Sequence, residues 1–144
     1  MKSMVLDASV IIKWVFPEQA KEEHVPQALS ILRDIQLGTI KIIQPIHWLV
    51  EVTAVIVRLQ PKIAIETFDL LSAMSFPTIE TAEVSHLACK LSERYDHHLF
   101  DTLYHAAALY QGNTTLITAD EKYFRKAQKQ GSIRRLADFS IFDD

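Results

Sequence analysis

The sequence predicts an α/β fold: a single-domain α/β/α sandwich built around a mainly parallel central sheet. Three observations lead to this prediction. Short apolar runs of strand length alternate with longer stretches of helical periodicity. The chain has 144 residues and no repeat or linker, so residues 1–144 are expected to form one domain. Its 49% hydrophobic and 23% charged residues are ordinary for a globular protein and argue against disorder.

Five segments have the short, apolar and mostly β-branched character of strands that are covered on both faces. In chain order they are 3–6, 40–44, 76–79, 114–118 and 132–136. Helical periodicity separates them at 10–16, 26–37, 46–59, 62–74, 81–94, 99–110 and 121–130. Pro45 is expected to open the helix 46–59, and the two helices on either side of Pro61 to form a hairpin. The alternation implies βαβ units with right-handed crossovers.

Two acidic residues follow predicted strands directly. Asp7 comes after the first strand, and LITADEKYF places Thr118 and Asp120 at the end of the fourth. Ligands of open α/β sheets bind beyond the carboxyl ends of the strands, which gives both acids a functional interpretation. Helix capping is the alternative, because Asp is a favoured N-cap and Thr118-x-x-Glu121 fits a capping box.

A narrow polar stripe runs along the helix 46–59, whose remaining surface is apolar. His47, Glu51, Ala54 and Arg58 share this stripe at helical spacing. A solvated face is the alternative interpretation of this stripe, but a helix at the protein surface normally shows a wider polar arc. The thin seam therefore predicts that Glu51 lines a cleft.

Asp101 lies in HHLFDTLYHAAALYQ, near the start of a predicted helix that it could cap. His97 and His105 stand four residues before and after it, a spacing that could chelate zinc or another metal that favours nitrogen and oxygen ligands. In the other interpretation Asp101 acts with the remaining acids and the histidines take no part.

The four acids are most informative as a set. If they converge, they repel one another and raise one another's pKa unless cations intervene. An all-oxygen cluster favours Mg²⁺ or Mn²⁺, which also bind water and phosphate oxygens. Without these four charges the net charge changes from -3 to +1, so the remaining surface need not repel RNA.

The combination of VLDASVIIKWV, PIHWLVEVTAVI, LFDTLYHAAAL and LITADEKYF resembles the PIN domain, and especially the VapC-type toxins of toxin–antitoxin pairs. The resemblance covers nearly the whole chain and implies a PIN-like fold. It implies a metal-binding catalytic quartet of Asp7, Glu51, Asp101 and Asp120, with supporting hydroxyls on Ser9 and Thr118. The chain departs from the family in EVTAVI, where many relatives carry Asn a few residues after the Glu.

This resemblance implies a ribonuclease dependent on Mg²⁺ or Mn²⁺, with products ending in 5′-phosphate and 3′-hydroxyl. It also implies a cognate antitoxin protein and a homodimer. Arg58, Lys13 and Lys122 are candidate contacts to the RNA backbone, with solvated surface charge as the alternative for each. A PIN nuclease of RNA processing outside a toxin pair fits the same motifs.

Other function classes remain as alternatives. A phosphotransfer receiver domain carries its acceptor Asp after the third strand, where this chain offers only Glu80. A haloacid-dehalogenase-like phosphohydrolase needs a second Asp two residues after the first, where this chain has Ser9. A non-catalytic interaction module would not need the intact quartet.

A cytoplasmic location without membrane association is expected. Cys89 is the only cysteine, which rules out an intrachain disulfide and suits a reducing compartment. No segment reaches the roughly 18 uncharged apolar residues that span a bilayer. Asp7 and Lys13 interrupt any hydrophobic region of a signal peptide.

Overall fold

A parallel four-stranded sheet forms the centre of the molecule. The computed structural model describes residues 2–19 and 22–140. The central sheet has the order β2-β1-β5-β6, formed by Ile40–Ile42, Lys2–Leu6, Thr114–Thr118 and Ile133–Arg135. Each neighbouring pair in it is parallel. The predicted α/β class with a mainly parallel central sheet is therefore confirmed.

The predicted strand 40–44 divides into two pieces that pair with different neighbours. β2 pairs with β1, whereas β3 (Gln44–Pro45) pairs with β4 (Thr78–Ile79) in a separate two-stranded sheet. The segment 76–79 is thus not a strand of the central sheet. Pro45 pairs with Ile79 instead of opening a helix, which begins only at Trp48. An apolar run shows that a segment is extended but not which strand it will pair with.

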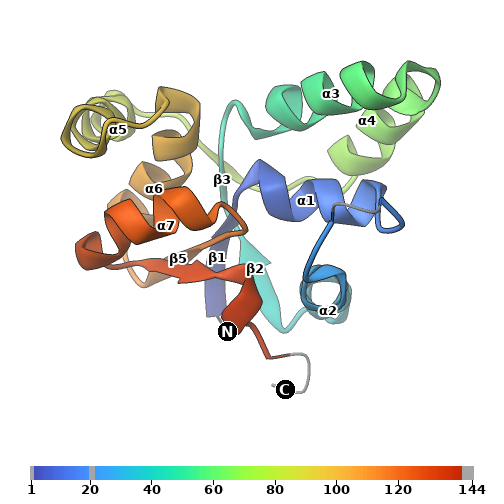
Figure 1. Ribbon diagram of the computed structural model, residues 1–144, viewed down its shortest axis with the longest axis horizontal. Helices are drawn as coiled ribbons and strands as arrows, with labels where there is room; N and C mark the ends of the chain where they lie inside the picture. Colours follow the sequence, from blue (N-terminus) through green and yellow to red (C-terminus); the bar gives the residue numbers. More distant parts are fainter. Residues whose placement is uncertain (1, 20–21, 141–144) are drawn as a thin grey trace.

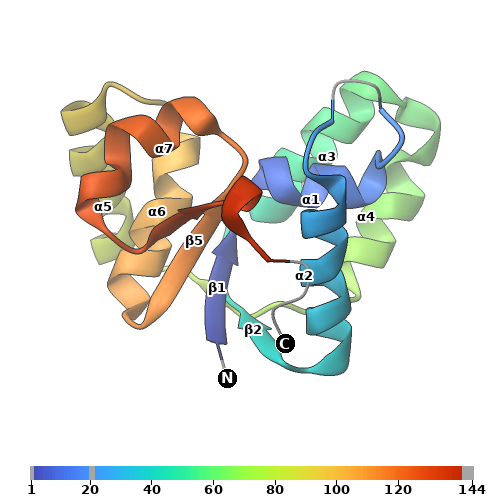
Figure 2. The same ribbon diagram turned by 60° about the horizontal axis from the view of Figure 1, so that its bottom comes forward.

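Helices flank β1 on both sides (Figures 1 and 2). The ranges of α1 to α4 are Ala8–Val15, Val25–Leu37, Trp48–Leu59 and Ala64–Ser72, and those of α5 to α7 are Ala82–Tyr95, Leu99–Gln111 and Glu121–Ala127. The first four lie to one side of β1 and the last three to the other. Within the described residues, no helix is long and apolar enough to cross a bilayer. The α3–α4 hairpin expected around Pro61 is present, with a 3-10 turn at Pro61–Ile63.

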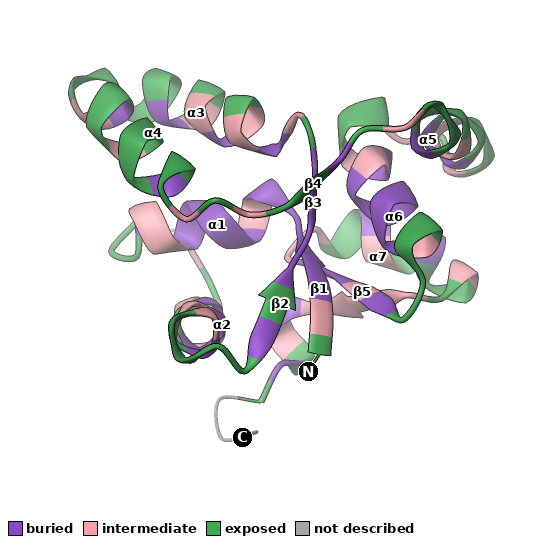
Figure 3. Ribbon diagram, turned by 180° about the vertical axis from the view of Figure 1, so that it is seen from behind, coloured by how far each residue is buried: buried purple, intermediate pink, exposed green. Residues whose placement is uncertain are grey.

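The core lies where the two helical layers meet the sheet. Val5 and Leu6 of β1 and Ile117 of β5 are completely buried, and Figure 3 shows buried ribbon along these strands and the adjoining faces of α1 and α6. Burying one such side chain contributes about 1.5–3 kcal/mol. Both α1 and α6 contact β1 and β5. The carboxyl ends of β1 and β5 are consequently packed between α1 on one side and α6 on the other.

Gln44 completes the end of β1 with its side chain. Its Oε1 accepts from the Leu6 backbone N at 2.8 Å, and its Nε2 donates to the Leu6 carbonyl at 2.9 Å. The side chain therefore takes the place of a neighbouring strand beyond the point where β2 ends. Gln44 is fully buried, so an unpaired backbone group here would be costly. The result is a fixed position for Leu6 and for Asp7 directly after it.

Candidate metal centre

Asp7 stands at the junction of β1 and α1 and serves as the helix N-cap. Its Oδ2 accepts from the Ser9 backbone N at 3.0 Å, and its own backbone N donates to the Ile117 carbonyl at 3.0 Å. Asp7 as a whole residue is only 8% exposed, far more buried than a simple surface cap requires. Asp7 can therefore cap α1 and also belong to the acidic cluster that is described below.

Two hydroxyls stabilise the ends of β1 and β5, and that of Ser9 joins the two ends. The Ser9 hydroxyl donates to Asp7 Oδ2 and accepts from the Ala119 backbone N at 3.1 Å. The Thr118 hydroxyl, which is buried, accepts from the Asp120 backbone N at 3.0 Å. The Ser9 hydroxyl therefore lies beside Asp7, and the Thr118 hydroxyl lies beside Asp120.

Asp120 is the N-cap of α7. Its Oδ1 accepts from the Tyr123 backbone N at 3.0 Å. The alternative capping box between Thr118 and Glu121 is wrong, because the helix starts two residues later than that motif requires and the Thr118 hydroxyl accepts from the Asp120 backbone N. The other oxygen, Oδ2, lies 3.3 Å from His97 Nε2.

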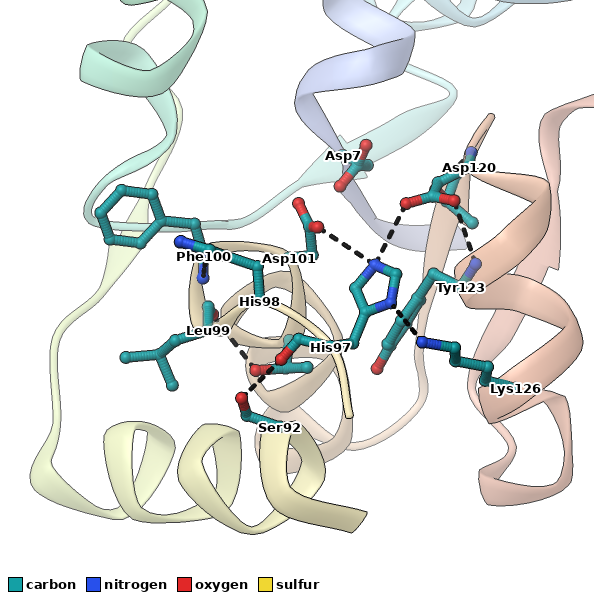
Figure 4. A network of polar contacts seen from close by, with 12 residues as sticks. Asp7, Ser92, His97, His98, Leu99, Phe100, Asp101, Asp120, Tyr123 and Lys126 are labelled. Carbon is teal, nitrogen blue, oxygen red and sulfur yellow. Dashed lines mark hydrogen bonds and ion pairs between the residues drawn. The ribbon is translucent and has the colours of Figure 1, made fainter. Parts of the chain in front are cut away.

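Asp101 lies in the first turn of α6 and faces the same histidine. Its Oδ2 is 3.2 Å from His97 Nε2. Figure 4 shows the carboxyl groups of Asp7, Asp101 and Asp120 directed toward one space, with the His97 ring beside it. His98 caps α6 by accepting from the Phe100 backbone N at 3.1 Å, so Asp101 is not the cap of its helix.

Glu51 reaches the cluster from α3. Its Oε1 accepts from the Tyr104 hydroxyl at 2.8 Å, and its Oε2 lies 4.0 Å from His47 Nε2. Tyr104 is fully buried on α6, between this glutamate and the core. A hydrogen bond to a carboxylate is stronger than one between neutral groups, so Tyr104 fixes the direction of Glu51.

The four acids act on one another electrostatically. Burial is the main cause that raises the pKa of Asp7 to about 7; the charges of Asp101 and Glu51 add to its effect, and the hydrogen bonds from Ser9 oppose it. Burial also raises the pKa of Glu51 and that of Asp101, and Asp120 adds to the latter. The structure thus gathers Asp7, Glu51, Asp101 and Asp120 in one region at the carboxyl edge of the sheet, although they come from four different elements.

The donor atoms in this region suit a hard divalent cation. Among the described His, Cys, Asp and Glu residues, one group of three places its ligand atoms within 4.8 Å of one another: His97, Asp101 and Asp120. Asp7 and Glu51 lie outside that group of three, but the charge of Asp101 adds to the effect of burial in raising the pKa of each of them. Carboxylate oxygens are the ligands that Mg²⁺ and Mn²⁺ prefer. Burial raises these pKa values most and mutual repulsion adds to it; a bound cation would favour the charged carboxylates against both, so the residues present fit such an ion.

His105 does not belong to this cluster, which corrects the alternative zinc site of His97, Asp101 and His105. Its ring is fully buried, where Nδ1 accepts from the Tyr123 hydroxyl at 2.7 Å and Nε2 donates to the Gly131 carbonyl at 2.8 Å. Both nitrogens are therefore used in the core, and burial lowers the pKa of the ring.

The polar stripe of α3 lines a hollow of about 310 Å³. Its lining is His47, Val50, Glu51, Ala54, Val55, Arg58 and Phe100, so all four stripe residues take part. Phe100 is 50% exposed, and exposed Arg58 shows no ion-pair partner among the described residues. The hollow thus includes Glu51 and extends along α3 to Arg58.

The three candidate RNA contacts differ in their surroundings. Lys13 is buried, and its ammonium is 2.6 Å from Glu22 Oε2, so the expectation of a surface cation is wrong there. The reason is that one turn of α1 faces the segment leading into α2. Lys122 and Arg58 are both exposed.

Sequence reasoning missed Tyr104 and Gln44. Tyr104 follows Asp101 by three residues, a helical spacing that could have signalled a shared face. Gln44 had no such signal, because its two bonds to Leu6 depend on how two strands are placed.

Comparisons with known proteins identify the family and the fold of the chain. The PIN domain family model matches residues 4–130. A search of curated proteins found no match. Nine chains of solved structures match, among them one from the crystal structure of FitAcB from Neisseria gonorrhoeae. That chain has a TM-score of 0.63 and 15% identity, over 94% of this chain and 99% of its own length. The family model spans most of the sequence and all four acids, and the chain therefore belongs to the PIN domain family.

Proposed function

We propose that this protein is a ribonuclease that depends on Mg²⁺ or Mn²⁺ and hydrolyses RNA phosphodiester bonds. PIN domains are nucleases that use divalent metals. The observation that supports the proposal most strongly is the convergence of Asp7, Glu51, Asp101 and Asp120 from four elements at one edge of the sheet. We also propose that residues 1–144 act as one PIN domain.

Each acid has a role in this proposal. Asp7, Asp101 and Asp120 would hold the cation, and Glu51 would either hold it or orient a water molecule. A bound Mg²⁺ or Mn²⁺ supplies charge stabilisation of the phosphate and makes a bound water more acidic. Ser9 keeps Asp7 in place while joining the ends of β1 and β5, and Thr118 holds the backbone of Asp120. Tyr104 does the same for Glu51.

The substrate in this proposal is single-stranded or looped RNA. The hollow along α3 leads from Glu51 to Arg58, whose guanidinium would contact a phosphate of the same strand. Lys122, at the start of α7, is the other exposed cation of the set.

The biological role we propose is that of a toxin with a cognate antitoxin protein, acting in the cytoplasm as a homodimer. The VapC-like motifs support this role, and a small neighbouring reading frame whose product binds and inhibits this chain would be its direct test. An active nuclease without such a partner would instead belong to RNA processing.

Cleavage of a mixed RNA pool is expected with millimolar Mn²⁺ or Mg²⁺ and is expected to stop on addition of EDTA. The physical reason is that unscreened carboxylates would repel the phosphate of the substrate. Gel analysis of end-labelled RNA measures the reaction, and end-group analysis should find 5′-phosphate and 3′-hydroxyl. Cleavage that persists in EDTA after exhaustive dialysis would contradict the metal-dependent mechanism.

Mn²⁺ or Mg²⁺ is also expected to raise the melting temperature at pH 8. A cation that binds only the folded state stabilises it, and an excess of about 100-fold over the Kd corresponds to roughly 5–10 °C for a chain of this size. The shift should shrink at pH 5, because the carboxylates with raised pKa values then bind protons in place of the cation. Differential scanning calorimetry measures both values. An equal shift at both pH values would place the bound cation elsewhere on the protein.

A further inference from the structure

His97 lies between two acids of the cluster without being one of the residues that the family resemblance assigns. Its side chain is 10% exposed, and its Nε2 is 3.2 Å from Asp101 Oδ2 and 3.3 Å from Asp120 Oδ2 (Figure 4). The same nitrogen therefore faces two carboxylates, one from the first turn of α6 and the other from the N-cap of α7. The imidazole joins two elements that are otherwise separate in the chain.

The backbone of His97 is held on the turn between α5 and α6. Its carbonyl accepts from the Ser92 hydroxyl, and its N donates to the Ser92 carbonyl at 3.2 Å. The Tyr123 ring lies against the imidazole, with 4.8 Å between the ring centroids. These contacts fix the position of the ring before any cation binds.

Lys126 determines which nitrogen of the ring carries hydrogen. Its Nζ is 3.3 Å from His97 Nδ1 and donates to the Asp96 carbonyl at 2.9 Å. An ammonium group has only hydrogens to offer, so Nδ1 must turn its lone pair toward it. The hydrogen then resides on Nε2, which donates toward the two carboxylates.

We propose that His97 is a positioning residue that holds Asp101 and Asp120 together for a divalent cation, an inference that rests on the proposed function. Without the shared donor, two carboxylates on different helices would separate because of their mutual repulsion. A carboxylate oxygen that accepts one hydrogen bond keeps a second lone pair, so both groups can still bind the cation. His97 thus lowers the cost of bringing the two ligands together.

The contrasting role for His97 is that of a metal ligand. Coordination through Nε2 would require the lone pair on that nitrogen and the hydrogen on Nδ1, where Lys126 lies. The observed contacts favour the donor role, and the two roles predict different results for the same protein.

Calorimetric titration with Mn²⁺ at pH 8 tests the donor role in the absence of RNA. His97→Ala is expected to weaken Mn²⁺ binding by about 10–100-fold, as loss of a group that orients a ligand usually does. His97→Gln keeps an N–H donor and should recover most of the affinity. His86→Ala, which removes an exposed imidazole from α5, should bind as the wild type does. Circular dichroism checks that each variant is folded.

The outcomes separate the two proposals. Unchanged Mn²⁺ affinity in a folded His97→Ala variant would overturn the role of His97 while leaving the proposed function intact. Wild-type protein that binds neither Mn²⁺ nor Mg²⁺ would overturn both.

Nitrogen-15 spectra of histidine side chains give the decisive signature. In wild-type protein saturated with Mg²⁺, His97 is expected to keep its hydrogen on Nε2. A hydrogen on Nδ1, with Nε2 bearing the lone pair in the Mg²⁺-saturated protein, would overturn the proposal in favour of direct coordination. In Lys126→Met, the hydrogen of the His97 ring should be distributed between Nδ1 and Nε2. If it stays on Nε2 as in the wild type, Lys126 does not determine its position.

Discussion

Asp101→Asn is expected to reduce RNA cleavage by on the order of 10²–10³-fold while leaving the protein folded. The substitution removes a negative charge from the cluster, so the cation is bound more weakly and the transition-state charge is less stabilised. Asp7→Asn should reduce the rate of RNA cleavage by a similar factor for the same reason. Initial rates on a fixed RNA substrate, with saturating Mn²⁺, measure the effect.

The control for this experiment is Asp69→Asn, which neutralises an exposed aspartate on α4 outside the cluster. It should cleave RNA at the wild-type rate. Full activity in both Asp7→Asn and Asp101→Asn would remove the acidic quartet from the mechanism. Unfolding of Asp7→Asn would show that the hydrogen bonds from Ser9 need a charged carboxylate at this cap and outweigh the relief of repulsion.

The second large effect concerns the stability of the metal-free protein. Asp7 has a pKa of about 7 in the folded state against an ordinary value of 3.8, so the folded protein binds a proton more tightly than the unfolded chain does. Its contribution to stability is complete at low pH and is lost as the pH rises through this interval, up to about 4 kcal/mol by pH 8. Glu51 and Asp101 act in the same direction.

Asp7→Asn should therefore stabilise the metal-free protein at pH 8 by up to about 4 kcal/mol, because Asn keeps the capping oxygen and carries no charge. At pH 4 the difference between the two proteins should nearly vanish. Urea titrations in EDTA at both pH values measure the free energies of unfolding. A variant that is less stable than the wild type at pH 8 would show that the buried charge of Asp7 is already compensated.

The positions of the helices and strands could largely be predicted from local pattern. Alternating apolar runs located β1, β5 and β6 to within a residue or two, since burial on both faces leaves a clear signature in the sequence. The division of 40–44 into β2 and β3 was not predictable, because it depends on which distant strand each half meets. Hydrophobic pattern carries no such information.

The chemistry of the site divides in the same way. Asp7, Glu51, Asp101 and Asp120 could be named from the sequence, because each interrupts an apolar segment or follows a strand. The two histidines spaced four residues from Asp101 could not be told apart. The structure directs His97 toward the carboxylates and His105 into the core.

Local sequence by itself determined the α/β class and the residue types that could bind a cation, since periodicity and capping act over a few residues. Only the tertiary structure decided that Gln44 completes β1, that Tyr104 fixes Glu51 and that Lys13 pairs with Glu22. Each of these contacts joins residues from different elements. Their partners are selected by the packing of the whole chain, where burial makes an unpaired polar group too costly to keep.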